Sequence, residues 1–263
     1  MSGERRTGCD PTLRFSSRVG QYERFRPGYP QELVGLLGRE CGLGPGARVA
    51  DIGCGTGLLA RVFLEFGCVV TGVEPNREMR EAGQRILAVE PRFEMADGRA
   101  EATGLATAGF DFLTAGQAFH WFDPPAARAE FHRILRPGGW LVLAWNERRP
   151  APGFMTEYEA LVREFADDSS RIDDADIGRV FGGPFRQVRL DNRQSLDGDG
   201  LIGRLTSSSY APLPGAANYQ AMVDRLRELF ARYQQDGRVT MLYDAHVFYG
   251  HVAEDPSESR LQP

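Results

Sequence analysis

The sequence predicts an α/β fold in which helices cover both faces of a doubly wound, mostly parallel sheet of seven strands. Two observations predict this fold. Between about residues 48 and 145, short apolar or β-branched runs alternate with amphipathic stretches, and two further strand-like runs occur late in the chain. The two late runs are expected to pair antiparallel at a sheet edge, so that the fold has an antiparallel edge strand and a helical cap insert.

The elements of the core are expected in regular alternation. Strands are predicted at residues 48–52, 68–73, 92–96, 110–115 and 140–145. Helices are predicted between them, at residues 58–66, 77–89 and 125–135. The turn from Arg136 to Gly139, with one proline and two glycines, is expected to end the last helix and to return the chain into the fifth strand.

Further elements are predicted on both sides of this core. Upstream helices at residues 16–24 and 30–40 are expected to cap the sheet. Downstream, helices are predicted at residues 154–166, 173–181 and 218–235, and the two late strands at residues 188–196 and 239–247. Low complexity is limited to residues 197–200, residues 207–209 and the C-terminus after Glu254, which is expected to be frayed.

The composition is ordinary for a globular protein of 263 residues and excludes several kinds of chemistry. All 31 basic residues are arginines, which excludes a lysine Schiff base and a P-loop lysine. The net charge of −5 and the scattered arginines argue against a nucleic-acid partner. The chain has no apolar run of about 18 residues and no signal-like start, so no membrane association is expected. Its four cysteines form no CxxC pair, which predicts reduced thiols in the cytoplasm and no metal site.

A glycine-rich turn follows the first predicted strand. The strand ends at Asp51, and the chain then passes through Gly53, Gly55 and Gly57 into a helix. Such a turn presents free backbone N–H groups that a ligand can approach without meeting a Cβ atom, which predicts a nucleotide-like ligand. The alternative is a tight turn with a structural role only.

An acidic residue ends the second predicted strand, where Glu74 follows Val73. In nucleotide-binding α/β folds, an acid at this place accepts hydrogen bonds from the ribose hydroxyls. A solvated surface glutamate is the alternative. The turn and the acid together predict a cofactor that contains a ribose.

Several ordered motifs span about residues 20 to 146. They are residues 51–57, residues 73–76 with Met79, residues 98–101, residues 110–111 with 118–121, and residues 135–139. In this order the motifs resemble the class I methyltransferases of the type-11 domain family, which includes the trans-aconitate methyltransferases. The resemblance implies a Rossmann-like methyltransferase sheet and S-adenosyl-L-methionine as the cofactor.

The resemblance also implies roles for individual residues. The glycines of the turn pack against the methionine and ribose portions, Glu74 binds the ribose, and Ala100 offers its backbone to the adenine ring. The residues expected at the cofactor are Tyr22, Arg26, Asp51, Gly53, Gly55, Gly57, Glu74, Pro75, Met79, Ala100, Glu101 and Gln117.

Two of these cofactor predictions rest on particular arguments. Arg26, with Tyr22 four residues before it, suits the methionine carboxylate because a guanidinium binds a carboxylate through two hydrogen bonds. The alternative is that these residues form a helix face that ends at a proline. The sequence departs from the family at Arg99, where an aspartate often accepts from the adenine amino group. Glu101 or Asp97 is expected to take over that role.

His120 is the predicted catalytic residue. It follows the fourth strand, and its imidazole can accept a hydroxyl proton near neutral pH. The competing interpretation treats His120 and Trp121 as a packing and cofactor-contact pair. Trp121, Asn146 and Tyr210 are the predicted substrate contacts, and the aromatic residues nearby indicate an apolar acceptor. Residues 117–120 lack the Asn/Asp-Pro-Pro-aromatic stretch of base-amino methyltransferases, which further disfavours nucleic acid.

The predicted function is therefore methyl transfer from S-adenosylmethionine to a small-molecule acceptor, at oxygen, with nitrogen, carbon and carboxylate acceptors left open. A cofactor-binding protein without transfer activity and a sulfonium-dependent cyclase or lyase remain alternatives. A nicotinamide-dependent oxidoreductase is a further one, although Leu58 stands where its third glycine would lie.

A monomer or homodimer is expected, built from four parts of the chain. They are capping helices at residues 1–46, a cofactor-binding core at 47–150, a cap insert with the last two strands at 151–253 and a flexible tail at 254–263.

Overall fold

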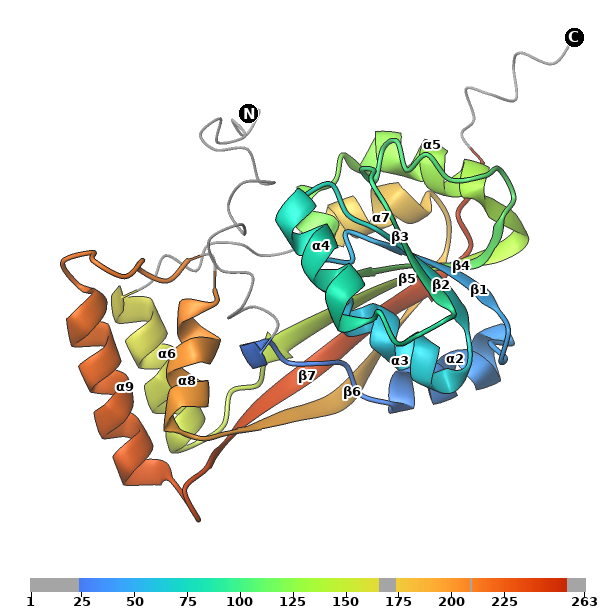
Figure 1. Cartoon of the computed structure of the whole chain (residues 1–263). Helices are drawn as coiled ribbons and strands as arrows, with labels where there is room; N and C mark the ends of the chain where they lie inside the picture. Colours follow the sequence, from blue (N-terminus) through green and yellow to red (C-terminus); the bar gives the residue numbers. More distant parts are fainter. Residues whose placement is uncertain (1–23, 166–173, 209, 255–263) are drawn as a thin grey trace, which may run out of the picture.

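One seven-stranded sheet organises the protein (Figure 1). The computed structural model describes residues 24–165, 174–208 and 210–254. The strands are β1 (Arg48–Ile52), β2 (Val69–Val73), β3 (Phe93–Ala96), β4 (Phe110–Gly116), β5 (Leu135–Arg148), β6 (Phe185–Leu196) and β7 (Val239–Gly250). Their order in the sheet is β3-β2-β1-β4-β5-β7-β6.

Helices connect and cover the strands. They are α2 (Glu32–Cys41), α3 (Leu58–Phe66), α4 (Arg77–Ile86), the 3-10 helix η3 (Phe119–Trp121), α5 (Pro124–Ile134), α6 (Phe154–Phe165), α7 (Asp174–Phe181), α8 (Gly198–Thr206) and α9 (Tyr219–Tyr233). None of the helices in the described part of the chain is long and apolar enough to cross a membrane.

The sheet confirms the doubly wound, mostly parallel architecture. Strands β1 to β5 pair in parallel, and β7 pairs antiparallel with both β5 and β6. The two late strands thus form an antiparallel pair at the edge, with β7 one position in and β6 outermost. The chain winds outward from β1 in both directions, so the carboxyl ends of β1 and β4 border the crevice where ligands bind in such sheets.

Apolar side chains cover both faces of the sheet. On one face, Phe63 and Leu64 of α3 and Leu37 of α2 join a fully or nearly fully buried cluster. On the other face, Phe131 of α5 and Phe181 of α7 belong to a second buried cluster. The continuous apolar runs of β1 and β4 are buried between these clusters, as expected for central parallel strands.

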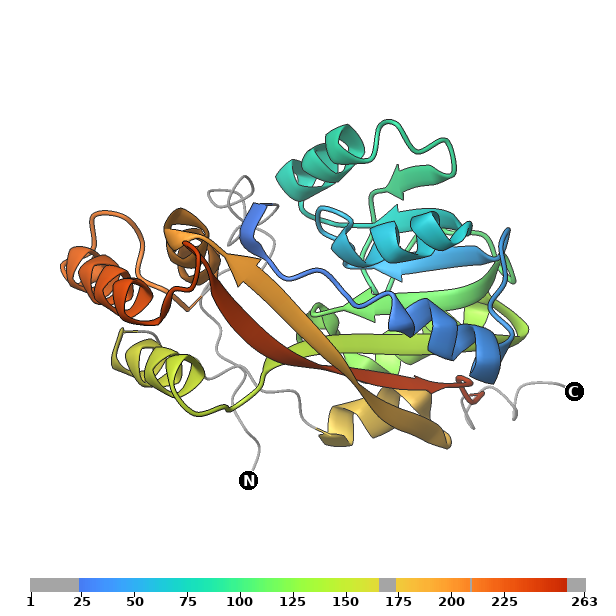
Figure 2. The same ribbon diagram turned by 90° about the horizontal axis from the view of Figure 1, so that it is seen from below.

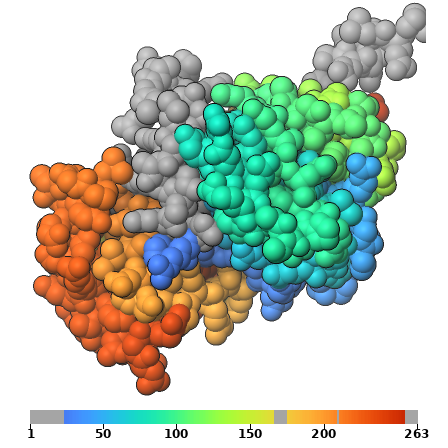
Figure 3. Space-filling view, in the orientation of Figure 1, coloured from blue at the N-terminus to red at the C-terminus, as the bar shows by residue number. Residues whose placement is uncertain are grey.

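A helical unit formed by α6, α8 and α9 packs on the far ends of β6 and β7. These two strands pair over twelve positions and continue beyond the end of β5, so they carry the unit away from the core (Figure 2). Its own buried cluster includes Tyr158, Leu205, Leu226 and Met241. In the space-filling view the orange helices form a separate lobe beside the blue and green core (Figure 3).

The structure differs from the predicted elements at two places. Helix α8 was not predicted; its cap is Asp197, whose side chain accepts from Gly200 N at 2.7 Å. The turn at residues 136–139 is an irregularity inside β5: Leu135 pairs with Phe110 and Trp140 with Phe112, so the residues between them loop out. The helix predicted at residues 16–24 lies outside the described residues except at its end.

Candidate active site

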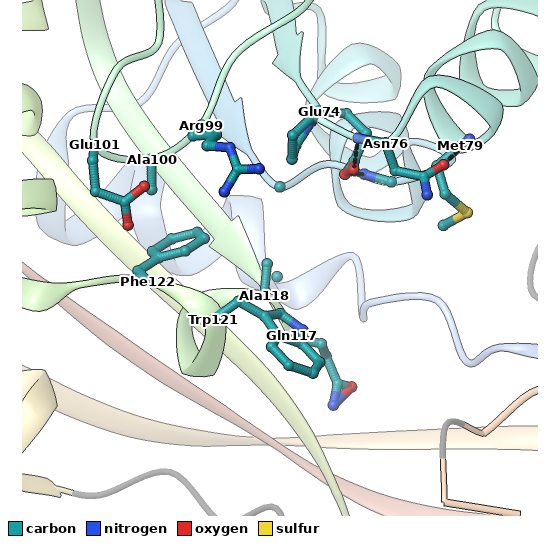
Figure 4. A pocket seen from close by; sticks show the side chains of 14 residues that line it. Glu74, Asn76, Met79, Arg99, Ala100, Glu101, Gln117, Ala118, Trp121 and Phe122 are labelled. Atoms are coloured by element: carbon teal, nitrogen blue, oxygen red, sulfur yellow. Dashed lines mark hydrogen bonds between the residues drawn. The ribbon is translucent and has the colours of Figure 1, made fainter. Parts of the chain in front are cut away.

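A pocket opens at the carboxyl ends of β1, β2 and β4 (Figure 4). Its empty volume is about 800 Å³, which includes space that is open to solvent. Its lining residues are Gly53, Gly55, Glu74, Pro75, Asn76, Met79, Arg99, Ala100, Glu101, Gly116, Gln117, Ala118, Trp121 and Phe122. Most of the residues predicted to meet the cofactor are therefore brought together in one place.

Glu74 is held rigidly at the end of β2. Its Oε2 atom accepts from Gly55 N and its Oε1 atom from Asn76 N, each at 2.9 Å, and the side chain is only 8% exposed. Burial is the main cause of a raised pKa for this carboxyl, and the two backbone N–H groups oppose that shift. The lone pairs that the backbone leaves free are available to hydroxyl donors in the pocket.

The pocket end opposite Met79 carries Arg99, Ala100, Glu101 and Phe122 (Figure 4). Of the two acids expected to replace the missing aspartate, Glu101 lines the pocket and also accepts from Asp123 N at 2.8 Å.

The other acid, Asp97, forms two hydrogen bonds of 3.1 Å to Arg80 and is not among the lining residues.

Among the lining residues named above that carry a side chain, Gln117 alone has a strained backbone. Its φ of 56° lies in the left-handed region, which residues with side chains seldom adopt. Its backbone N–H donates to Ala144 O at 3.1 Å, so β5 holds this conformation in place. Strain of this kind often occurs where a chain must present groups to a ligand.

A second pocket adjoins the first and shares Gly53, Gly116 and Gln117 with it. Arg26 of the N-terminal segment and Asp51 of β1 both line this second pocket. Asp51 is fully buried: Oδ1 accepts from the Thr114 hydroxyl at 2.9 Å, while Oδ2 has no hydrogen-bond partner among the described residues. Burial raises the pKa of Asp51 to about 7 despite the Thr114 bond, because the ionised carboxylate is poorly solvated there. A cationic donor such as an ammonium group would stabilise the ionised form, so this carboxyl suits such a ligand.

The glycines of the turn serve two purposes. A Cβ atom on Gly53 would lie 2.6 Å from Cβ of Ala118 and beside the Phe122 ring, at the pocket wall. Gly57 is not a lining residue of either pocket; a Cβ atom there would lie 2.5 Å from Leu87, and its φ is 86°. Gly57 thus allows α3 to start close to the end of α4.

His120 lies in η3, between Ala118 and Trp121 of the pocket wall. Its ring centroid is 4.5 Å from that of Trp121 and 5.5 Å from that of Trp145. Solvent reaches the side chain, but the protein packed around the ring and, to a smaller extent, the charge of Arg26 lower the pKa of His120 to about 4. The imidazole is therefore neutral at physiological pH.

The remaining predicted residues lie elsewhere. Asn146 donates to Gly28 O at 3.0 Å and accepts from Asn192 at 2.8 Å, which joins β5, β6 and the N-terminal segment. Tyr210 accepts from Arg148 at 2.5 Å in the helical unit. Tyr22 falls outside the described residues.

Five lining residues were absent from the predicted site residues: Asn76, Arg99, Gly116, Ala118 and Phe122. Asn76 carried a signal, because an asparagine directly before a helix is a frequent cap, and its side chain accepts from Met79 N at 2.8 Å. Arg99 and Ala118 lie within the motifs that carry the resemblance, and Phe122 is one of the aromatic residues that indicate an apolar pocket. No local pattern marks Gly116.

Comparisons with known proteins identify methyltransferases as relatives of this chain. Residues 50–143 match the model of a methyltransferase domain family. An uncharacterised methyltransferase of Mycobacterium tuberculosis is 35% identical over 229 residues, which cover 85% of this chain and 88% of that protein.

Two solved structures share the fold. A structure from Anaeromyxobacter dehalogenans, named as a candidate type II methyltransferase, has a TM-score of 0.67 and 24% identity and covers 88% of this chain and all of its own. Phosphoethanolamine N-methyltransferase 2 of Haemonchus contortus, solved with S-adenosylhomocysteine, has a TM-score of 0.53 and 16% identity and covers 91% of this chain and 58% of its own.

The groups in the two pockets fit the cofactor of such enzymes. A buried carboxylate at Glu74 suits ribose hydroxyls, and the buried Oδ2 atom of Asp51, with no partner among the described residues, suits an ammonium group. The two pockets meet at Gly53, so one elongated ligand can occupy both. This chain belongs to the class I S-adenosylmethionine-dependent methyltransferases, and S-adenosylmethionine is its cofactor.

Proposed function

We propose that this enzyme transfers the methyl group to an oxygen atom of a small-molecule acceptor. The observation that carries this proposal is the neutral imidazole of His120 beside the wall of the cofactor pocket. A neutral imidazole has a free lone pair for a hydroxyl proton, whereas a protonated one has none.

Residues of both pockets are proposed to bind the cofactor. Glu74 accepts from the ribose hydroxyls, while Arg26 and Asp51 meet the carboxylate and the ammonium group of the methionine portion. Pro75, Met79, Ala100 and Glu101 surround the adenine ring. With the adenosine in the first pocket and the methionine in the second, the shared segment at Gly116 and Gln117 borders the reactive centre.

The bound cofactor supplies a methyl group on a sulfonium, which is already a good leaving group. The protein then has to place the acceptor oxygen in line with that methyl group, and such positioning provides most of the rate enhancement. His120 would take the acceptor proton as the oxygen attacks. Since its pKa of about 4 makes it a weak base, it suits an acceptor hydroxyl that is itself acidic, such as a phenol or an enol.

Two aromatic side chains define the surroundings of the acceptor. The rings of Trp121 and Trp145 both lie next to the His120 ring. Their faces suit a flat apolar body, and Trp121 is 38% exposed, so part of this surface is open for contact. An acceptor with a conjugated ring beside its hydroxyl group matches this environment.

Transfer of label tests the proposal. The purified enzyme is incubated with methyl-labelled S-adenosylmethionine and a metabolite extract, and labelled products are isolated and assigned by NMR. We expect a methyl group on oxygen; labelled products that carry the methyl group on nitrogen or carbon, or no labelled product from an enzyme that binds the cofactor, would contradict the proposal.

Variants of His120 test the role of the imidazole. His120→Ala is expected to lose turnover while its affinity for S-adenosylhomocysteine stays nearly unchanged. His132→Ala, on α5, is the control and should keep full turnover. A parallel loss of cofactor affinity in His120→Ala would instead assign this residue to the cofactor site.

A further inference from the structure

A group of polar side chains is buried or partly buried in the helical unit. Tyr158 comes from α6, Arg204 from α8, Arg148 from the end of β5 and Tyr243 from β7, and Tyr210 follows α8. We call these five residues the arginine cluster. Such groups are costly to bury, so each needs a partner or a purpose.

One of the two arginines is neutralised within the protein. Arg148 forms an ion pair with Glu159 and donates to the Tyr210 hydroxyl at 2.5 Å. Its charge is therefore balanced by a carboxylate of the neighbouring helix α6.

The other arginine lacks such a partner. Arg204 is 4% exposed and donates to the Tyr243 hydroxyl and to Ser208 Oγ, both at 3.0 Å. Among the described residues, no carboxylate lies within ion-pair distance of its guanidinium group. A buried cation that only neutral groups contact is destabilising, unless an anion joins it.

Tyr158 provides a second, independent observation. Its side chain is fully buried, and its hydroxyl has no hydrogen-bond partner among the described residues. The charges of Arg204 and Arg148 both act on this hydroxyl, which places it close to the two guanidinium groups. A buried hydroxyl without an acceptor loses the hydrogen bonds that it makes in water.

The arginine cluster borders the cofactor site. Arg26, which lines the second pocket, donates to Ser207 O at 3.1 Å, and Ser207 adjoins the Ser208 that Arg204 contacts. The charge of Arg26 also acts on the Tyr210 hydroxyl. Ser207 and Ser208 therefore connect the second pocket to the arginine cluster.

We propose that the arginine cluster binds a carboxylate group of the methyl acceptor, with Arg204 as its counter-ion and Tyr158 as a hydroxyl donor. This inference rests on the proposed function, because it names a chemical group of the acceptor in that reaction. The carboxylate anchors and orients the acceptor, while the oxygen that receives the methyl group lies toward His120.

The charges favour a carboxylate over a phosphate. One arginine remains unbalanced, so one negative charge neutralises the cluster, whereas a phosphate dianion beside Glu159 leaves excess negative charge. The donors are a guanidinium fork and a phenol, which match the planar arrangement of two carboxylate oxygens.

Three small probes test this site on the full-length protein saturated with S-adenosylhomocysteine. They are benzoate, its neutral analogue benzamide and inorganic phosphate, and binding is measured by calorimetry and by the shift in Tm. We expect benzoate to bind and to raise the Tm, and benzamide and phosphate to do neither. Equal binding of benzoate and benzamide, or binding of phosphate without benzoate, would overturn the proposal.

Variants then locate the benzoate site. Arg204→Met is expected to weaken benzoate binding about tenfold or more through the loss of charge-assisted hydrogen bonds, and Tyr158→Phe by a smaller factor. Arg225→Met, which removes an exposed arginine of α9, is the control and should bind benzoate like the wild type. Benzoate affinity that stays the same in Arg204→Met would place the site elsewhere.

Stability without benzoate separates a binding role from a structural one. If Arg204 serves to bind an anion, the Tm of Arg204→Met without benzoate should be at least as high as that of the wild type, because the substitution removes an uncompensated buried charge. A large loss of Tm in Arg204→Met and in Tyr158→Phe would mean that these groups hold the fold together and would refute the proposal.

The two proposals fail in different ways. Methyl transfer to oxygen of acceptors that all lack a carboxylate refutes the anion site and leaves the proposed function intact. Specific binding of benzoate by a protein that methylates no oxygen atom refutes the proposed function instead.

Discussion

Replacing Glu74 tests the cofactor site at its most constrained residue. Both carboxylate oxygens are already fixed by the backbone N–H groups of Gly55 and Asn76, so they meet the ribose without further ordering. Glu74→Ala removes these acceptors together with the charge. Glu74→Gln keeps one oxygen acceptor and removes only the charge and the second acceptor.

The expected loss of cofactor binding free energy follows from the hydrogen bonds that are removed and from the cost of burying the ionised Glu74 carboxylate. A charge-assisted hydrogen bond contributes about 1.5 to 3 kcal/mol, and we place two ribose hydroxyls on this carboxylate. Because burial already disfavours the ionised form of Glu74, part of that gain is offset. We expect Glu74→Ala to weaken cofactor binding by about 1 to 3 kcal/mol, or about 5- to 150-fold in Kd, and Glu74→Gln by less.

Calorimetric titration with S-adenosylhomocysteine measures this change, and circular dichroism verifies that each variant is folded. Glu81→Gln is the matched control, because Glu81 lies on the adjacent helix α4, is 45% exposed and pairs with Arg77 at the surface. A folded Glu74→Ala variant that binds with wild-type affinity would refute the assignment of the ribose to this carboxylate.

Three further predictions concern protonation and the turn. Since the folded-state pKa of His120 is depressed to about 4, its contribution to stability is present above pH about 6.5 and is lost as the pH falls toward 4; NMR titration of the ring should give that pKa, and a value near 6.5 would contradict it. The folded-state pKa of Asp51 is raised to about 7, so the stability that it contributes is complete below pH about 4 and is lost as the pH rises through 7. Asp51→Asn should flatten this part of the curve of unfolding free energy against pH, and an unchanged slope would show that another group titrates there. Gly53→Ala should lower the Tm and weaken S-adenosylhomocysteine binding, because the new Cβ atom meets Ala118 at 2.6 Å and φ is 65°; unchanged values would mean that the turn is free to shift.

The sequence predicted the core of the fold because its strands are marked by local patterns. Strands β1, β2 and β4 are short apolar runs buried on both faces, and each starts or ends within a residue or two of its expected place. Helix α8 was missed because glycine and aspartate dominate its start. Its stability comes from tertiary packing of residues such as Leu201 and Leu205 in the helical unit, which a local pattern does not reveal.

The same distinction explains what was found of the site. Glu74 and the glycines of the turn lie within motifs of a few residues, so their spacing alone indicated that they belong to one binding site. Arg148 and Arg204, by contrast, are far apart in the sequence, and both act on the Tyr158 hydroxyl only because α6, α8 and α9 pack with the ends of β6 and β7. Asn146 stands at the predicted position at the end of β5, but it is engaged by Gly28 and Asn192, and a sequence pattern cannot show such partners.

A crystal structure of the protein with S-adenosylhomocysteine tests whether the two joined pockets hold the cofactor. We expect ribose hydroxyls within hydrogen-bond distance of Glu74, the adenine beside Ala100 and the homocysteine end between Arg26 and Asp51. Density for the ligand outside these pockets, or a ribose that does not contact Glu74, would contradict this expectation.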